Sequence, residues 1–139
     1  MMRIASFYDM EKSPVSVAAA IAAALAQVNA GFETAMQAVR AEYPESEVLS
    51  WGKQEAEARA WQADAGAATP LLDALAAARG MDKAELAGRI LAKAAAYAVA
   101  TGQLIGRRQA LEDALQALPE DATPEQIQAI AWRDVEPLQ

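Results

Sequence analysis

The chain of 139 residues contains no cysteine and no histidine. The first absence excludes disulfides, thiolate nucleophiles and cysteine-based metal sites. The second removes the commonest general base and the commonest protein metal ligand. Together the two absences argue against an enzyme. We therefore expect no catalytic residue, no metal site and no cofactor.

Positive charge is also scarce, with 12 Lys and Arg residues against 19 Asp and Glu residues and a net charge of −7. A nucleic-acid-binding protein needs a surplus of basic side chains to displace counterions from phosphates. We therefore expect no nucleic-acid partner, and for the same reason no acidic membrane. An acidic chain could instead occupy the nucleic-acid site of a host protein, and this inhibitor function stays open as an alternative.

Aromatic residues make up only 6% of the chain, and much of its apolar content is alanine. A compact chain of this length buries roughly 68% of its unfolded surface, which is enough for a core. Since each alanine buries little area, that core must be thin and its helices must approach closely. Each tryptophan then supplies a large share of the buried area.

No apolar run predicts a signal peptide or a membrane span. The most apolar stretch, 17–26, is mostly alanine and about half the length that a bilayer requires. Near the N-terminus, Arg3 is followed by Asp9 and Glu11 before any apolar core develops. The sequence therefore predicts a cytosolic protein.

Proline directly after serine or threonine predicts three helix starts, because proline fits the first helical position. These starts are Ser13-Pro14, Thr69-Pro70 and Thr123-Pro124. From the first, we expect a helix to Tyr43, followed by a turn over 44–50.

The other helix boundaries follow from capping residues. Ser50 predicts the cap of a helix that ends at Ala63, and Gly80 predicts the left-handed end of the helix from Pro70. Asp82 opens a long helix to Leu118, with Glu85 in the position of a capping box. We expect a short last helix to carry Ile127, Ile130 and Trp132.

Two long helices carry large apolar residues at spacings of three, four and seven, which is typical of coiled-coil-like packing. In the first, the stripe is Ile21, Leu25, Val28, Phe32, Met36, Val39 and Tyr43. In the second, it is Ile90, Tyr97, Leu104, Leu111 and Leu118. The fold class is therefore all-α, a helical bundle with two long helices in coiled-coil-like packing plus shorter helices. We expect one helical domain over 13–133, a weakly ordered lead over 1–12 and a flexible tail over 134–139.

A ridge of small residues follows the opposite side of the second long helix. Its members recur every four residues: Ala94, Ala98, Gly102, Gly106, Ala110 and Ala114. Each glycine costs about 1 kcal/mol relative to alanine in a helix interior. One interpretation is close approach of another helix, which would make a homo-oligomer through the Ala94–Ala114 ridge. The alternative is that Gly102 kinks or breaks the helix.

Three segments together resemble a group of small helical proteins encoded beside tail-fibre genes in bacteriophages and prophages. They are Ser50–Trp61, Thr69–Gly80 and Leu104–Asp113, within a match over roughly 27–118. The first 26 residues match nothing in that group. The resemblance implies a role in tail or tail-fibre assembly, without catalytic residues, in the bacterial host cytoplasm or on the virion.

Under this resemblance we expect an ATP-independent chaperone that binds a tail-fibre or other tail subunit through apolar helix faces. A structural minor component of the tail is the alternative. The candidate partner-binding residues are Trp51, Trp61, Gly102, Gly106, Arg107 and Arg108. Each also has a structural interpretation: the tryptophans as core, and the arginines as partners of Glu112 and of the Leu104/Leu111 stripe.

Overall fold

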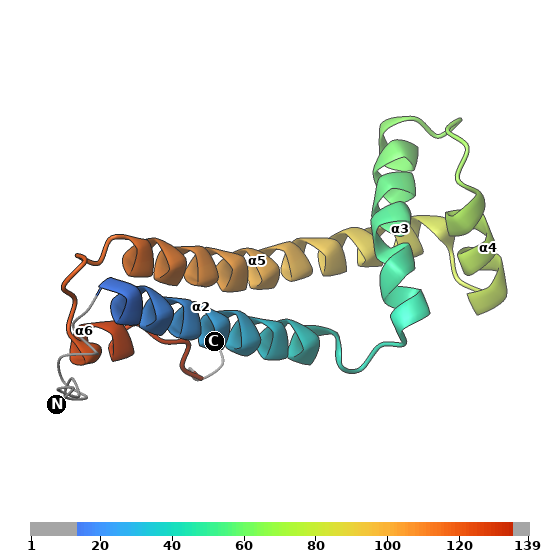
Figure 1. The fold of residues 1–139 in the computed structure, drawn as a ribbon. Coiled ribbons are helices and arrows are strands. Elements are labelled where there is room, and N and C mark those ends of the chain that lie inside the picture. The colour runs from blue at the N-terminus through green and yellow to red at the C-terminus, as the bar shows by residue number, and fades with distance from the viewer. Residues whose placement is uncertain (1–13, 135–139) are drawn as a thin grey trace, which may run out of the picture. The chain divides into compact units, whose positions relative to one another are not determined.

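The structure is a computed structural model that describes residues 14–134. These residues form helices α2 Pro14–Arg40, α3 Glu45–Ala63, α4 Pro70–Arg79, α5 Lys83–Gln116 and α6 Pro124–Gln128 (Figure 1). No strand occurs among them, and the all-α prediction is confirmed, with two long helices and three shorter ones. The predicted lead over 1–12, the cap at Ser13 and the tail after residue 134 lie outside the described residues.

The chain divides into two compact units. Of the described residues, unit 1 contains 14–37 and 103–134, and unit 2 contains 38–102. Helix α5 therefore gives its first part to unit 2 and its last part to unit 1. The single helical domain over 13–133 stays a prediction.

In unit 1, α2 and the last part of α5 run side by side in opposite directions (Figure 1). The predicted stripes meet here, because Ile21, Leu25 and Phe32 pack on the same core cluster as Leu104 and Leu111. The centre of that cluster is Val17, Val28, Leu115, Ala122, Ile127 and Trp132. The large apolar faces expected to meet a client are therefore used inside this unit.

Trp132 is the aromatic centre of unit 1 and is only 6% exposed. The side-chain amide of Gln27 holds its backbone twice, donating to the Trp132 carbonyl at 2.9 Å and accepting its N–H at 3.0 Å. A Cβ on Gly31 would lie 2.4 Å from the ring atom Cδ1, so only glycine leaves room for the indole. The sequence placed Trp132 on the last helix, but α6 ends at Gln128 and the indole lies beyond it.

Unit 2 has a core of smaller side chains, supplied by α3, α4 and the first part of α5. Its buried residues are Ala58, Leu72, Ala76, Leu86 and Ala87. Trp61 and Ile90 pack partly buried against this cluster. The close packing of small residues is what the alanine-rich composition predicts.

The turn predicted over 44–50, with its cap at Ser50, is wrong. Helix α3 begins at Glu45, directly after Pro44, and Ser50 lies more than one turn inside it. Acidic residues at 45 and 47 favour this earlier start, because negative charge stabilises a helix N-terminus. The Ser50 hydroxyl donates instead to the carbonyl of Glu47 at 2.7 Å.

Other boundaries agree more closely with the sequence. Gly80 ends α4 in the left-handed conformation with φ 62°, and Asp82 accepts the N–H of Glu85 at 3.0 Å at the start of α5. Thr123 forms a full capping box with Gln126. The two long helices end a few residues earlier than expected, at Arg40 and Gln116.

Helix α5 runs without interruption through both interior glycines of the small-residue ridge. The alternative interpretation, a break of the helix at Gly102, is therefore wrong. A Cβ added at Gly102 or Gly106 would meet no atom within 4 Å. Both glycines are exposed, so no described part of the chain covers the ridge there.

Residues Ser16–Arg40 form a helix that is long and apolar enough to cross a membrane. Core helices of soluble proteins and N-terminal signal sequences meet the same criteria of length and composition. In unit 1 this helix contributes Val17 and Val28 to the core. The absence of a membrane partner stays a prediction.

Candidate functional site

Unit 2 contains a hollow of about 510 Å³, which we call the α3–α5 groove. Three helices line it. Helix α3 contributes Glu47, Trp51, Gly52, Gln54 and Glu55, helix α4 contributes Leu75 and Arg79, and helix α5 contributes Leu86, Arg89, Ile90, Lys93, Ala94, Tyr97, Ala98 and Thr101. The volume lies in the range of about 300–1,000 Å³ that is typical of binding pockets.

The spacing of the lining residues on α5 explains why they share one face. Ile90, Lys93, Ala94, Tyr97 and Ala98 recur at intervals of three and four, which brings side chains to the same side of a helix. The prediction that the ridge residues Ala94 and Ala98 lie opposite Tyr97 is therefore wrong. The short side chains of Ala94 and Ala98 leave space next to the helix, and the longer lining side chains border that space. The groove is thus a consequence of the helical pattern of large and small residues.

Aromatic rings form a chain at one part of the groove. The ring of Trp51 lies edge-on to Tyr43, with centroids 5.0 Å apart, and edge-on to Tyr97, at 5.2 Å. Trp51 is only half-buried, so part of its ring remains exposed. Edge-to-face pairs of this kind are worth about 0.5–1.5 kcal/mol beyond the area they bury. They hold Trp51 in place without covering it.

Lys93 lies over the same rings. Its Nζ is 3.7 Å from the centroid of Tyr43 and 5.1 Å from that of Trp51. A cation at this distance is attracted by the electron-rich face of an aromatic ring. The ammonium is thus held at the groove by rings that leave its charge unneutralised.

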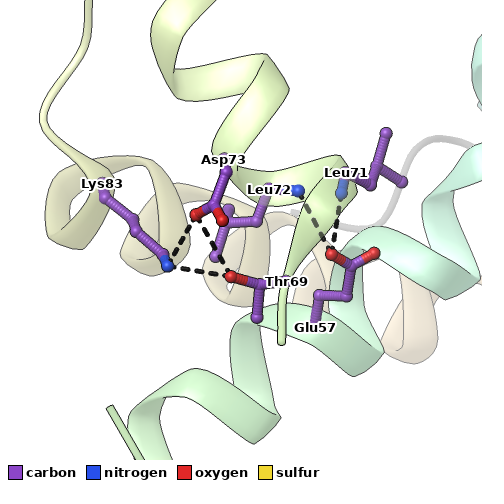
Figure 2. A network of polar contacts seen from close by, with 6 residues as sticks. All are labelled: Glu57, Thr69, Leu71, Leu72, Asp73 and Lys83. Atoms are coloured by element: carbon purple, nitrogen blue, oxygen red, sulfur yellow. Dashed lines mark hydrogen bonds and ion pairs between the residues drawn. The ribbon is translucent and has the colours of Figure 1, made fainter. Parts of the chain in front are cut away.

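A polar network fixes α4, which forms part of the groove wall (Figure 2). Glu57 of α3 is only 6% exposed, and its Oε1 accepts the N–H groups of Leu71 at 2.9 Å and Leu72 at 3.3 Å. These donors lie in the first turn of α4, where backbone N–H groups have no partner within the helix. Glu57 therefore caps α4 in place of Thr69. The side chain of Thr69 makes no capping hydrogen bond.

Thr69 takes part in the same network in another way (Figure 2). Its hydroxyl donates to Asp73 Oδ1 at 3.2 Å and accepts from Lys83 Nζ at 2.8 Å. Lys83 also pairs with Asp73 at 2.7 Å and lies 4.7 Å from the ring centre of Trp61. The hydrogen bond from Lys83 lowers the pKa of Asp73 below its usual value of 3.8, and the Thr69 hydroxyl acts in the same direction. This network joins the start of α5 to α4 and α3.

The two predicted tryptophan sites differ in their surroundings. Trp51 lines the α3–α5 groove, as a partner-binding residue should. Trp61 packs against the buried cluster of unit 2 and under the Lys83 ammonium, which is its structural interpretation. The predicted binding role of each remains a prediction.

The predicted arginines of unit 1 are engaged within the chain. The guanidinium of Arg107 lies 4.1 Å from the ring centre of Trp132 and donates to the backbone carbonyl of Arg133. Arg108 pairs with Glu112 at 2.8 Å, as the sequence predicted, and donates to Asn29 Oδ1 at 2.9 Å. The pair with Glu112 confirms the structural interpretation of Arg108, while the contacts of Arg107 are with Trp132 and Arg133 and the predicted contact with the Leu104/Leu111 stripe stays a prediction.

Sequence reasoning missed several residues of the groove. The sequence did not indicate Arg79 or Lys93 as candidate binding residues, and it placed Tyr97 only on an apolar stripe. A sequence signal did exist, because Lys93 and Tyr97 are four residues apart on one helix face that also carries alanines. Their meeting with Tyr43 and Trp51 is a tertiary contact that spacing along the chain does not encode.

Among residues 14–134, no group of three or more Asp and Glu residues could hold a metal ion. The groove offers apolar surface, aromatic faces and charges of both signs. This arrangement is suited to recognising an amphipathic surface.

Residues 92–132 match a protein family described as the HI1402 helical domain. The match covers less than a third of the chain and includes most of α5, the whole of α6 and Trp132. The description names no activity, and the chain is similar to this family over that stretch. No curated protein and no solved structure was found to match the chain.

Proposed function

We propose that this protein is a non-catalytic binding protein in the assembly of a phage tail or tail fibre, and that it holds a segment of its client in the α3–α5 groove. The resemblance of three sequence segments supports the phage setting. The groove supports the binding role, and the half-buried Trp51 on its wall is the observation that carries the proposal. Tryptophan is the residue type most enriched among the energetic centres of protein interfaces.

The mechanism requires no nucleotide. A chaperone of this kind acts by binding one state of its client more tightly than the others, which shifts the population toward that state. The client is a fibre or tail subunit before it joins its neighbours. Binding in the groove would cover an apolar segment of that subunit until the segment is buried in the assembly.

Co-expression with a tail-fibre gene tests the proposal. We expect the protein to raise the yield of soluble, trimeric fibre and to co-purify with the unassembled subunit. Ala98→Phe should abolish both effects, because Ala98 is exposed and lines the groove, where a phenyl ring would fill the space.

Ala96→Phe is the matched control, since Ala96 is exposed on the same helix and does not line the groove. This variant should retain full effect. An unchanged fibre yield with the unmodified protein would contradict the chaperone function. Equal behaviour of the two phenylalanine variants would contradict the groove as its site.

A further inference from the structure

The basic residues of the α3–α5 groove differ in whether they have a partner. Arg89 pairs with Glu85 at 2.8 Å on the same helix. Arg79 and Lys93 line the same groove, and neither forms an ion pair with a described residue. The chain has an excess of carboxylates, with a net charge of −7, so two basic groups without an ionic partner in one groove are unusual.

The ammonium of Lys93 is already oriented. The rings of Tyr43 and Trp51 lie 3.7 and 5.1 Å from it. An ammonium has three N–H donors, and an aromatic face occupies one side of it without supplying a negative charge. The remaining side is available for an incoming carboxylate, which would not have to immobilise a free lysine side chain.

Acidic residues also line the groove. Helix α3 contributes Glu47 and Glu55, of which Glu55 is paired with Arg59 at 2.9 Å. Glu47 forms no ion pair with a described residue. Among the charged lining residues, Arg79 and Lys93 are therefore two cations without an ionic partner, against one such carboxylate, Glu47.

The backbone of the walls indicates what kind of segment can bind. All lining residues belong to helices, and none belongs to a strand. An extended peptide would find no free strand edge to pair with. A helical segment brings its own backbone hydrogen bonds and needs only side-chain contacts.

We propose that the occupant of the α3–α5 groove is an amphipathic helix of the client, with acidic residues beside its apolar stripe that pair with Arg79 and Lys93. The apolar stripe lies on Trp51, Ile90 and Ala94. The inference rests on the proposed function and specifies the chemistry of the client segment.

Three synthetic helical peptides test this charge preference. They share one apolar stripe over about five helical turns and carry glutamate, glutamine or lysine beside it. Fluorescence anisotropy with the full chain at low salt should give the tightest binding for the glutamate peptide. We expect Arg79→Glu combined with Lys93→Glu to weaken that peptide about tenfold and to favour the lysine peptide.

The control is Arg133→Glu, which makes the same kind of charge change at an exposed residue of unit 1 outside the groove. This variant should leave the order of the three peptide affinities unchanged. Lys93→Gln provides a second variant that removes the charge without introducing repulsion, and circular dichroism checks that each variant remains helical. Weakening of the glutamate peptide by Lys93→Gln, but not by Arg133→Glu, supports the proposal.

Failures of the two proposals can be told apart. Equal binding of the three peptides, lost in Ala98→Phe, would overturn the charge preference and leave the groove as the site. If Ala98→Phe abolishes client binding but none of the three peptides binds, the occupant of the groove is not an acidic helix. If the peptides still bind to the Ala98→Phe variant, the groove is not the binding site, and both proposals are wrong.

Discussion

The two units of this protein use their large aromatic residues in opposite ways. Unit 1 buries Trp132 at its centre, where the Gln27 amide holds its backbone and Gly31 makes room for its ring. The buried residues of the unit 2 core are aliphatic, such as Ala58 and Leu72, and Trp51 lies on the wall of a groove. In a chain with few aromatics, a ring that is not needed for the core is a candidate for binding.

Unit 1 also has a hollow, of about 450 Å³, between α2 and the segment around α6. Its lining is mostly apolar and carries no charged side chain: Ser16, Ala20, Ala23, Ala24, Gln27, Pro124, Ile127, Gln128, Ile130 and Ala131. Such a surface has no group that could select one partner by charge. The comparison shows why the α3–α5 groove, which charged side chains of both signs line, is the better candidate site.

The sharpest test of this difference is to truncate one tryptophan in each unit. Trp132→Ala should lower the free energy of unfolding by about 3–5 kcal/mol, because a buried indole leaves a large cavity. Trp51→Ala should cost only about 1–2 kcal/mol, because part of its area already faces water. Urea unfolding followed by far-ultraviolet circular dichroism measures both, and similar losses would mean that the two rings are equally structural.

The next largest effect concerns Glu57, which accepts backbone N–H groups in the first turn of α4. Glu57→Ala leaves the N–H groups of Leu71 and Leu72 without their acceptor and should cost about 1–3 kcal/mol. Glu57→Gln keeps an acceptor oxygen and should lose much less. Hydrogen exchange at both amides should accelerate in the alanine variant. If glutamine were as damaging as alanine, the charge of Glu57 rather than its hydrogen bonds would hold the helix.

Substitution of glycine by alanine should have opposite signs at two positions. At Gly31, overpacking against Trp132 costs about 1–3 kcal/mol, while the gain in helix propensity is only about 1 kcal/mol. Gly31→Ala should therefore destabilise the chain. Gly102→Ala meets no atom within 4 Å and should stabilise it by about 1 kcal/mol. Thermal unfolding of both variants checks the signs, and destabilisation at Gly102 would show that something covers the ridge.

The smallest effect is a dependence on pH. Because the pKa of Asp73 is lowered in the folded chain, its contribution to stability is present well above pH 3.8 and is lost as the pH falls below that value. In the Asp73→Asn variant, the free energy of unfolding should therefore fall less than in the unmodified chain as the pH is lowered through this range. Asp113→Asn is the control, since its side chain bonds to no described residue. An identical acid response in the two variants would refute the role of the Lys83 contact.

Much of the fold could be predicted from local sequence signals. The Thr69-Pro70 and Thr123-Pro124 starts, the glycine end at Gly80 and the apolar stripes each act through residues a few positions apart. The start of α3 was missed because serine at position 50 was a better cap by type than the residues at 44–45. Favourable charge at the helix N-terminus outweighed that preference.

The candidate site was only partly predictable. Trp51 was found because a tryptophan in an alanine-rich chain is conspicuous, and the wider set of six predicted residues is divided between the two units. Arg79 and Lys93 gain their meaning only from contacts and partners that the fold creates. Gly31 could not be found either, since the need for glycine comes from an indole about a hundred positions later in the chain.

The indole N–H signals of Trp51 and Trp132 in a ¹⁵N nuclear magnetic resonance spectrum report on the two units separately. Titration with the glutamate-bordered helical peptide tests most directly whether the exposed ring, rather than the buried one, marks the binding surface. We predict that the Trp51 signal and the amides of Ala94 and Ala98 shift while the Trp132 signal does not. A shift confined to Trp132, or a spectrum that does not change at saturating peptide, would contradict this account.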